Sequence, residues 1–338
     1  MEITIDILKQ IGSTSQTVKW FKKRFPSEKA SLKDVIIKMH EDGKWYEISC
    51  LYDNIQSVLC DLDGNDFKGC LQTYHDAIEE LTKDNPIYDE YGNIANTDTE
   101  NNFSAKLVNQ KITCATNAFF SKVLSLGKEN AITTNGKAGQ FAIKGFANEI
   151  SLNGMQNTVG NQGDFCAISN NGDHGNIFTN GHNCRISNNG YTNKILNMGA
   201  HSAISVNGLS NKVTNKSKSS RIGITGDFTN VENVGDWVKI GSVGNTSKIK
   251  SVGDNVTIVS GGGSPEIEAI GKNAVLSITD VDRFKVGNGG AVSVAYFDGE
   301  RTRFAVGYVG ENLKPDTWYR LCISTGEFVE DFQDDEWA

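Results

Sequence analysis

Proline is scarce in this sequence, with four residues in 338, whereas glycine is abundant, with 35. So little proline argues against a disordered linker protein, and so much glycine suits a fold with many tight corners. No positively charged segment followed by an apolar core opens the chain, and no apolar run approaches the roughly 20 residues that cross a membrane as a helix. We therefore expect a cytoplasmic protein that makes no membrane contact.

Enzyme motifs are missing as well. The sequence contains no GxGxxG motif, no Walker motif and no recognisable Ser/His/Asp set. Asp236 and Asp254 lie 18 residues apart and are candidates for a carboxylate pair of the glycosidase kind. A row of corner charges of alternating sign explains them more simply, so we expect no enzymatic activity and no cofactor.

Metal-binding patterns are incomplete. Asp61, Asp63 and Asn65 have the spacing of a calcium loop. Asp66 stands where that loop needs glycine, and Gln72 stands where it needs glutamate. We therefore expect a surface turn in this segment.

The cysteines and histidines do not complete a metal site either. Cys50, Cys60 and Cys70 are ten residues apart, which is no zinc spacing. His182 and His201 should lie near one corner of the fold, with His174 on its other side. We expect ordinary surface histidines and no metal.

A nine-residue repeat fills the middle of the chain. Steps of nine from Gly127 to Gly271 meet glycine at sixteen of seventeen positions, with Ser217 as the exception. Four residues before each glycine, from Ile132 to Ile267, stands isoleucine or valine, except at Phe141. The alternation of small, aliphatic and polar residues within a unit is typical of a strand with one buried face. The glycine is expected to supply the positive φ of a tight corner.

Similar residues recur every 18 positions rather than every 27. At the third position of alternate units the inward side chains come in matched neighbours, such as Cys166 with Cys184 and Ser202 with Ser220. Inward asparagines also recur and should form amide ladders along the axis. The sequence therefore predicts a mainly β fold, a two-sided parallel β-solenoid with 18-residue coils.

The ends of the chain differ from the repeat. Apolar spacing and capping residues predict a small helical domain over residues 1–82, followed by a polar linker over 83–103. The solenoid is expected over 104–280. Two hairpin signals, Asp298-Gly299 and Thr325-Gly326, predict an antiparallel β cap over 281–338, which ends in an acidic tail and covers the open edge of the last coil.

These ends resemble parts of phage proteins. The opening ITIDILKQIGSTSQTVKWFKKRFP, followed by KWYEISCLYDNI, looks like the short helical N-terminal domain of many phage and prophage repeat proteins. The ending KPDTWYRLCISTGEFVE is similar to the segment that closes some of their solenoids. The repeat is similar in spacing to the calcium-bound β-rolls of the RTX type, but most units lack the corner aspartate. The resemblance implies a calcium-free protein of a mobile element, acting in a bacterial host cell.

A candidate binding surface lies on the outward side of one set of units. Arg185, Arg221 and Lys239 occupy the fourth position, and Ser187 and Ser205 occupy the sixth. Rigid rows of guanidinium and hydroxyl groups suit phosphates or an acidic protein face. Charges that only keep an exposed strand soluble are the plainer explanation.

These patterns predict a non-enzymatic binding protein, and the resemblance of its ends to phage proteins implies that it inhibits a component of a bacterial host's defence. The expected partner is a host protein or nucleoprotein complex, with an anionic part of it on the basic row. A homo-oligomer is compatible with the sequence. The alternative is a structural or adhesive element of a virion or cell surface, a class that is usually trimeric.

Overall fold

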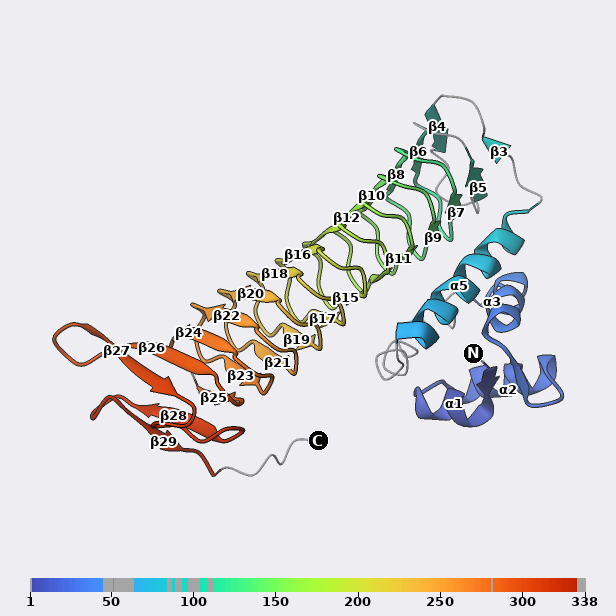
Figure 1. The fold of residues 1–338 in the computed structure, drawn as a ribbon. Helices are drawn as coiled ribbons and strands as arrows, with labels where there is room; N and C mark the ends of the chain where they lie inside the picture. Colours follow the sequence, from blue (N-terminus) through green and yellow to red (C-terminus); the bar gives the residue numbers. More distant parts are fainter. Residues whose placement is uncertain are drawn as a thin grey trace. The chain divides into compact units, whose positions relative to one another are not determined.

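The computed structural model describes residues 2–44, 51, 64–83, 87–88, 93–96, 104–108, 112–280 and 282–332. The chain divides into two compact units, and Figure 1 shows the helices and strands of both as a ribbon. Unit 1 consists of Met1–Arg185 and Lys194–Met198, and unit 2 consists of Ile186–Asn193 and Gly199–Ala338. Both units are built mainly of short parallel strands.

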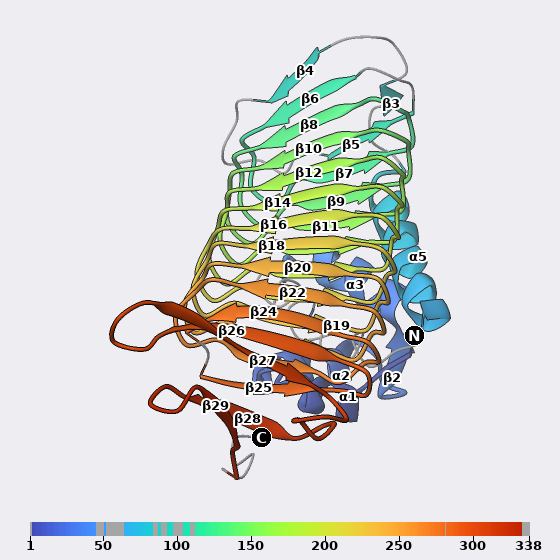
Figure 2. The ribbon, with the colours of Figure 1, turned by 60° about the vertical axis from the view of Figure 1, so that its left-hand side comes forward.

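A two-sided parallel β-solenoid makes up most of unit 1 (Figure 2). Consecutive strands alternate between two sheets, so Ala131 pairs with Thr113 in the preceding coil and with Glu149 in the next. The even-numbered strands are β4 (Asn93–Asn96), β6 (Thr113–Thr116), β8 (Ala131–Thr134), β10 (Glu149–Leu152) and β12 (Ala167–Asn170). The odd-numbered strands are β3 (Ile87–Tyr88), β5 (Ser104–Leu107), β7 (Lys122–Ser125), β9 (Gln140–Ile143), β11 (Thr158–Asn161), β13 (Asn176–Thr179) and β15 (Lys194–Asn197). Strands β3 and β4 lie within the segment expected to be a linker.

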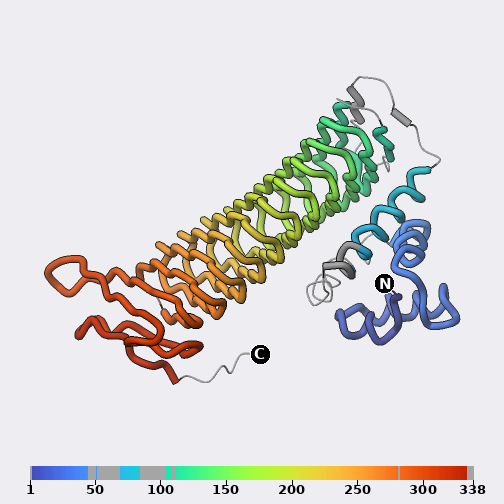
Figure 3. Tube along the Cα trace, viewed as in Figure 1, coloured from blue at the N-terminus to red at the C-terminus, as the bar shows by residue number. Residues whose placement is uncertain are grey.

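The same arrangement continues in unit 2, where the trace winds through successive coils (Figure 3). Its even-numbered strands are β14 (Arg185–Asn188), β16 (Ala203–Val206), β18 (Arg221–Ile224), β20 (Lys239–Ser242), β22 (Thr257–Ser260), β24 (Val275–Thr279) and β26 (Ala291–Phe297). The first residue of β14, Arg185, is assigned to unit 1. Its odd-numbered strands are β17 (Lys212–Asn215), β19 (Asn230–Asn233), β21 (Lys248–Ser251), β23 (Glu266–Ala269) and β25 (Arg283–Val286). We call the outer surfaces of the two sheets the even face and the odd face.

The pairing confirms the 18-residue coil in both units. In unit 1, Ile150 pairs with Ile168, and the backbone N–H of Arg185 donates to the carbonyl oxygen of Cys166 at 2.9 Å, so Cys184 follows Cys166 in the stack. In unit 2, Ile204 pairs with Ile222. A 27-residue coil is therefore excluded. The fifth position of the repeat faces inward, and its isoleucines and valines form the buried core of the solenoid.

Buried asparagines form rows along the stacks. The Oδ1 atom of Asn130 accepts the backbone N–H of Ile112, and that of Asn148 accepts the N–H of Asn130, both at 2.8 Å. Asn215 donates through Nδ2 to Oδ1 of Asn233 at 2.7 Å. The predicted asparagine ladder is thus present, but most of its hydrogen bonds among the described residues join an amide to the backbone rather than to another amide. Such bonds satisfy polar groups that would otherwise be buried without a partner.

The corner glycines do not have the predicted backbone conformation. Positive φ falls on the residue two positions later, for example 58° at Trp237 and 54° at Asn255. The glycines are needed because the preceding coil lies against them. A β-carbon on Gly253 would lie 2.0 Å from the carbonyl oxygen of Gly235, far inside contact distance. The missing side chain therefore permits stacking at the spacing of about 4.8 Å between paired strands.

The corner residues with positive φ bond to the next coil. The backbone N–H of Trp237 donates to the carbonyl oxygen of Asp254 at 2.9 Å. The backbone N–H groups at the strands donate to the preceding coil instead, as the N–H of Lys239 does to the carbonyl oxygen of Ser220 at 3.0 Å. A left-handed conformation costs a non-glycine residue roughly 1 kcal/mol. The bond to the next coil offsets that cost, and each coil is tied to both of its neighbours.

Unit 1 begins with a small helical region. It contains β1 (Glu2–Thr4), α1 (Ile5–Gln10), α2 (Ser15–Arg24), β2 (Lys29–Ser31), α3 (Leu32–Glu41) and α5 (Gly64–Leu81). Side chains cap two of these helices, because Oγ1 of Thr14 accepts the N–H of Thr17 at 3.2 Å and Oγ of Ser31 accepts that of Asp34 at 3.1 Å. Strands β1 and β2 pair antiparallel.

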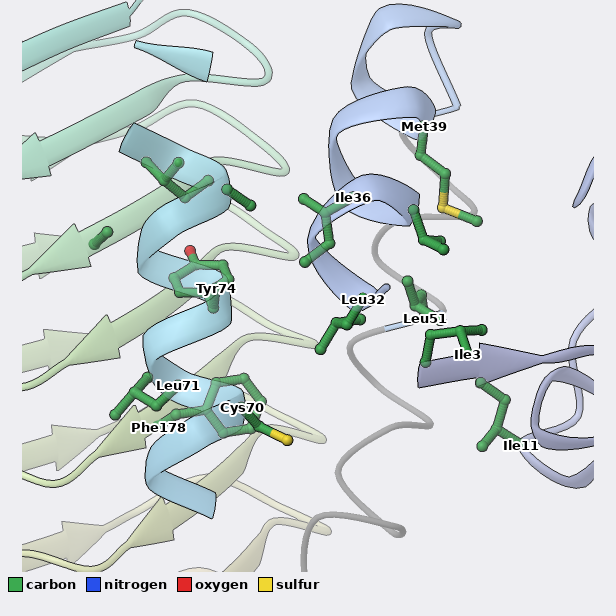
Figure 4. Packing of buried hydrophobic residues seen from close by; sticks show 14 of the residues in the cluster. Ile3, Ile11, Leu32, Ile36, Met39, Leu51, Cys70, Leu71, Tyr74 and Phe178 are labelled. Atoms are coloured by element: carbon green, nitrogen blue, oxygen red, sulfur yellow. The ribbon is translucent and has the colours of Figure 1, made fainter. Parts of the chain in front are cut away.

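Helix α5 lies on the odd face of unit 1, between the strands and α3 (Figure 4). It contacts β7, β9 and β11. The surface turn expected around Asn65 is wrong from Gly64 onward, because Leu71, Tyr74 and Ile78 recur at helical spacing and bury one side of a helix. Cys70 also lies in this core, whereas Asp61, Asp63, Cys50 and Cys60 lie outside the described residues.

The C-terminal cap of unit 2 is antiparallel, as predicted. Strand β27 (Thr302–Tyr308) pairs with β26, and β28 (Trp318–Cys322) pairs with β25 and with β29 (Glu327–Glu330). Each sheet therefore ends in an antiparallel strand that occupies the hydrogen-bonding edge of its last parallel strand. Phe284 anchors the cap, with its ring centroid 6.0 Å from that of Tyr319 and 5.2 Å from that of Phe328.

Candidate binding surface

Arg221 and Lys239 are neighbours on the even face of unit 2. They begin β18 and β20 and pair directly with each other in parallel register. The strand alternation turns the next residues, Ile222 and Ile240, into the core and leaves the two cations exposed. Paired strands are about 4.8 Å apart, so the two positive charges start from adjacent points of a rigid sheet.

The predicted serines do not accompany this basic pair. Ser205 pairs with Gly223, and Gly223 pairs with Gly241. Arg221 and Lys239 are therefore flanked by glycines on their own strands, whereas Ser205 stands beside Ala203. The row of hydroxyl groups ends one coil before the basic pair begins.

The two remaining predicted residues are on β14. Arg185 is exposed and belongs to unit 1, and Ser187 is half-buried and belongs to unit 2. Both occupy outward positions, because Ile186 between them is buried. The basic pair within unit 2 is thus the part of the predicted row that the structure brings together.

The odd face of unit 2 has a different electrostatic character. The Nζ atom of Lys212 lies 2.8 Å from Oε1 of Glu232, and that of Lys250 lies 3.3 Å from Oε2 of Glu268. Within the part of the chain that the structure describes, neither Arg221 nor Lys239 has a carboxylate oxygen within 4 Å. Lys212 and Lys250 on the odd face are therefore paired with carboxylates, whereas the basic pair has no such counter-charge among the described residues.

A second basic row lies on the odd-numbered strands. Lys194 is half-buried in unit 1, while Lys212 and Lys248 begin β17 and β21 in unit 2. Lys212 forms the ion pair described above, and exposed Lys248 is in register with Glu266. Acidic residues thus accompany this row in unit 2.

The corner aspartates hold the backbone of the next coil. Oδ1 of Asp236 accepts the N–H of Asp254 at 3.0 Å, and Oδ1 of Asp254 accepts that of Lys272 at 2.7 Å. Oδ1 of Asp227 likewise accepts the backbone N–H of Asn245 at 2.7 Å. These bonds give the carboxylates considered for glycoside hydrolysis a structural role along the corner.

Histidines lie exposed at the corners. His174 and His182 are in unit 1, and His201 is in unit 2. The N–H of His182 donates to Oδ1 of Asp164 at 2.7 Å, as in the other corner links. Among the residues with described positions, no group of three or more histidine, cysteine, aspartate or glutamate side chains is arranged to hold a metal ion.

An outward asparagine row was missed in the sequence. Beside the even-numbered strands of unit 1, Asn135 donates to Asn117 at 2.8 Å, Asn153 to Asn135 at 2.9 Å and Asn171 to Asn153 at 2.9 Å. The signal was present, because asparagine recurs every 18 residues from Asn117 to Asn171, and the last three of these asparagines stand immediately before a corner glycine. This exposed amide ladder borders the even face of unit 1 with hydrogen-bonding groups.

The helices give no sign of a membrane span: none of those described is both long and apolar enough to cross a bilayer. The comparisons with known proteins add no relative. No protein-family model matches the chain, and neither a curated protein nor a solved structure matches it. The geometry of the two units is therefore the basis for a functional assignment.

Proposed function

We propose that this chain is a non-enzymatic binding protein that takes an anionic partner on the even face of unit 2. One observation carries the proposal, namely that Arg221 and Lys239 are adjacent, exposed and without a carboxylate within ion-pair distance among the described residues. Like charges directly opposite each other on a sheet repel. An acidic or phosphorylated partner surface would remove that repulsion.

The surroundings of the basic pair support close approach by a partner. Ala203, Ser205, Gly223 and Gly241 are all exposed and have small side chains. They leave the even face flat around the two cations. Because each coil is bonded to both neighbours, the face is also held rigid, which reduces the conformational entropy lost on binding.

The biological setting rests on the ends of the chain. Their resemblance to segments of phage and prophage repeat proteins supports an origin in a mobile element and action inside a bacterial host cell. In that setting the partner is a host protein or nucleoprotein complex with an acidic surface, and blocking a defence component is the proposed outcome. Salt should weaken such an interaction, because the charges that make it are exposed in the free protein.

Affinity capture from bacterial lysate tests the proposal. The wild-type protein, the variant Arg221→Ala/Lys239→Ala and the control Lys248→Ala/Lys272→Ala would be compared, since the control removes two exposed lysines of unit 2 elsewhere. Loss of the same captured partner in the first variant alone, with nearly unchanged melting temperatures, is the expected result. Equal capture by all three proteins would show that the basic pair is not the binding surface.

Oligomeric state distinguishes the alternative class. A structural or adhesive virion element would be expected to form a trimer, and light scattering of the purified protein measures this directly. A trimer that captures no partner would favour the structural element over the binding protein.

A further inference from the structure

A helix-turn-helix arrangement opens unit 1 (Figure 1). Helix α1 ends at its cap residue Ile11, Gly12 has a φ of +70°, and Thr14 caps the start of α2. The turn closes on itself because the N–H of Ser13 donates to the carbonyl oxygen of Leu8 at 2.9 Å. Two helices joined by a four-residue turn with a left-handed glycine are typical of the helix-turn-helix motif.

Helix α2 has a buried side and a basic exposed side. Thr17 and Phe21 are buried, and Phe21 belongs to the same core as Leu8 and Ile11 of the preceding helix and turn. The exposed positions Gln16, Lys19 and Lys23 follow helical spacing and form one stripe. The second helix of the motif thus presents its polar side to solvent.

The charge of this region differs from that of the whole chain. Residues 2–44 contain nine lysines and arginines against six aspartates and glutamates, whereas the chain carries a net charge of -8. Lys22 pairs with Glu28 at 3.0 Å. Lys19 and Lys23 have no carboxylate oxygen within 4 Å among the residues that are described. Two cations on the exposed stripe are therefore available to an anionic partner.

A brace from α3 fixes the position of α2. The Nε1 atom of Trp20 donates to Oδ2 of Asp42 at 2.7 Å, and the guanidinium of Arg24 donates to the same carboxylate. Asp42 is the residue that caps the C-terminal end of α3. Two consecutive turns of α2 are thereby tied to another helix, as positioning in a groove requires.

We propose that α2 docks in the major groove of double-stranded DNA. A groove about 12 Å wide accepts a helix about 10 to 12 Å across. In this placement Lys19 and Lys23 contact phosphates, and Ser15 and Gln16 at the start of the helix face base edges, where a glutamine side chain pairs well with adenine. The proposal concerns a separate surface from the basic pair of unit 2 and does not depend on it.

Fluorescence anisotropy with a labelled duplex of about 30 base pairs and mixed sequence tests this placement with the full chain. The affinity of the wild type should fall steeply with salt. The variant Lys19→Ala/Lys23→Ala should bind about tenfold more weakly at 0.1 M salt, and its log-log salt slope should be about two smaller in magnitude. The control Lys128→Ala/Lys137→Ala removes two exposed lysines at solenoid corners of unit 1 and should bind as the wild type does.

A variant with the opposite effect complements this loss. Glu28→Gln releases Lys22 from its ion pair and should tighten duplex binding several-fold. Duplex binding that is unchanged in Lys19→Ala/Lys23→Ala would overturn the proposal, as would no binding by the wild type up to about 100 µM. Loss of binding in Arg221→Ala/Lys239→Ala but not in Lys19→Ala/Lys23→Ala would overturn it as well and assign the DNA to the even face.

Discussion

The ring of Tyr74 lies so close to Gly160 that a β-carbon on the glycine would be 2.6 Å from two of its ring carbons. Gly160 is an outward residue of β11, and its missing side chain leaves a recess in the odd face that the tyrosine of α5 fills. The tyrosine is almost fully buried there, and this burial raises the pKa of its phenol above the usual range. The docking of α5 therefore depends on one absent side chain.

Replacing Gly160 with alanine should loosen α5. The added methyl group overlaps the ring of Tyr74, and overpacking of a buried contact costs about 1 to 3 kcal/mol. Hydrogen exchange of the backbone amides in Gly64–Leu81 would report faster opening. The matched control is Gly241→Ala, because a β-carbon there has no neighbour within 4 Å. Unchanged exchange in the Gly160 variant would contradict the proposed fit.

Alanine in place of the corner residue Gly253 should strongly destabilise unit 2. Its β-carbon would collide with the carbonyl oxygen of Gly235, and backbone on both sides would have to move. Asn255→Gly, two positions later, replaces a residue with a φ of 54° and should be nearly neutral. Urea unfolding of the two variants compares these roles. Similar stabilities would argue against steric exclusion as the reason for the glycine.

Truncation of Ile204 to alanine should lower the free energy of unfolding by about 2 to 5 kcal/mol. The side chain is 3% exposed and is stacked in register with Ile222. Val259→Ala removes part of an exposed side chain on the same sheet and should change stability by about 0.5 kcal/mol or less. Chemical denaturation measures both, and a small effect at Ile204 would mean that the core tolerates a cavity there.

Acid should destabilise the region where the helices meet the odd face. Burial lowers the pKa of His40 to about 3, with a contribution from Lys122, and burial lowers that of His75 to about 3, with a contribution from Lys144. Both imidazoles are therefore neutral in the folded state and bind protons more readily when unfolded. Their stabilising contribution is complete above pH of about 6.5 and is lost as the pH falls toward 3, by about 1.4 kcal/mol per pH unit for each histidine.

Urea unfolding between pH 7 and pH 4.5 checks this dependence. The double variant His40→Leu/His75→Leu should flatten it. Asp42 does not interfere, because Arg24 and Trp20 lower the pKa of its carboxyl to about 2, and its contribution is lost only below about pH 3.8. An equally steep pH dependence in the double variant would assign the effect to other groups.

Much of the fold was predictable because few arrangements of strands are compatible with a nine-residue repeat. Matched neighbours such as Cys166 and Cys184 distinguish an 18-residue coil from a 27-residue coil, since only residues in register share an environment. The hairpin at Asp298-Gly299 likewise follows from turn chemistry. In both cases a local pattern determines which strands pair.

Other features depend on contacts that a repeat pattern does not reveal. The regular spacing of glycine within the sequence shows that a side chain is excluded at these positions, but it does not show whether the backbone conformation or a neighbouring coil excludes it. The outward residues Leu124, Ala142, Phe178 and Leu196 are apolar, and this run could have indicated that something covers the odd face of unit 1. For the candidate site, the sequence predicted the adjacency of Arg221 and Lys239, but the ion pairs of Lys212 and Lys250 on the odd face became clear only in three dimensions.

Consecutive nine-residue repeats alternate between the two sheets, so the length of the solenoid can change without disturbing the later strands only by an even number of repeats. Loss or duplication of two nine-residue repeats removes or adds one whole 18-residue coil, and every later residue keeps its face. Loss or gain of a single nine-residue repeat would move each later strand to the opposite sheet, so β26, with which β27 pairs, would belong to the other sheet. Genetic growth or shrinkage of the solenoid is therefore compatible with its C-terminal cap only when whole coils of 18 residues are gained or lost.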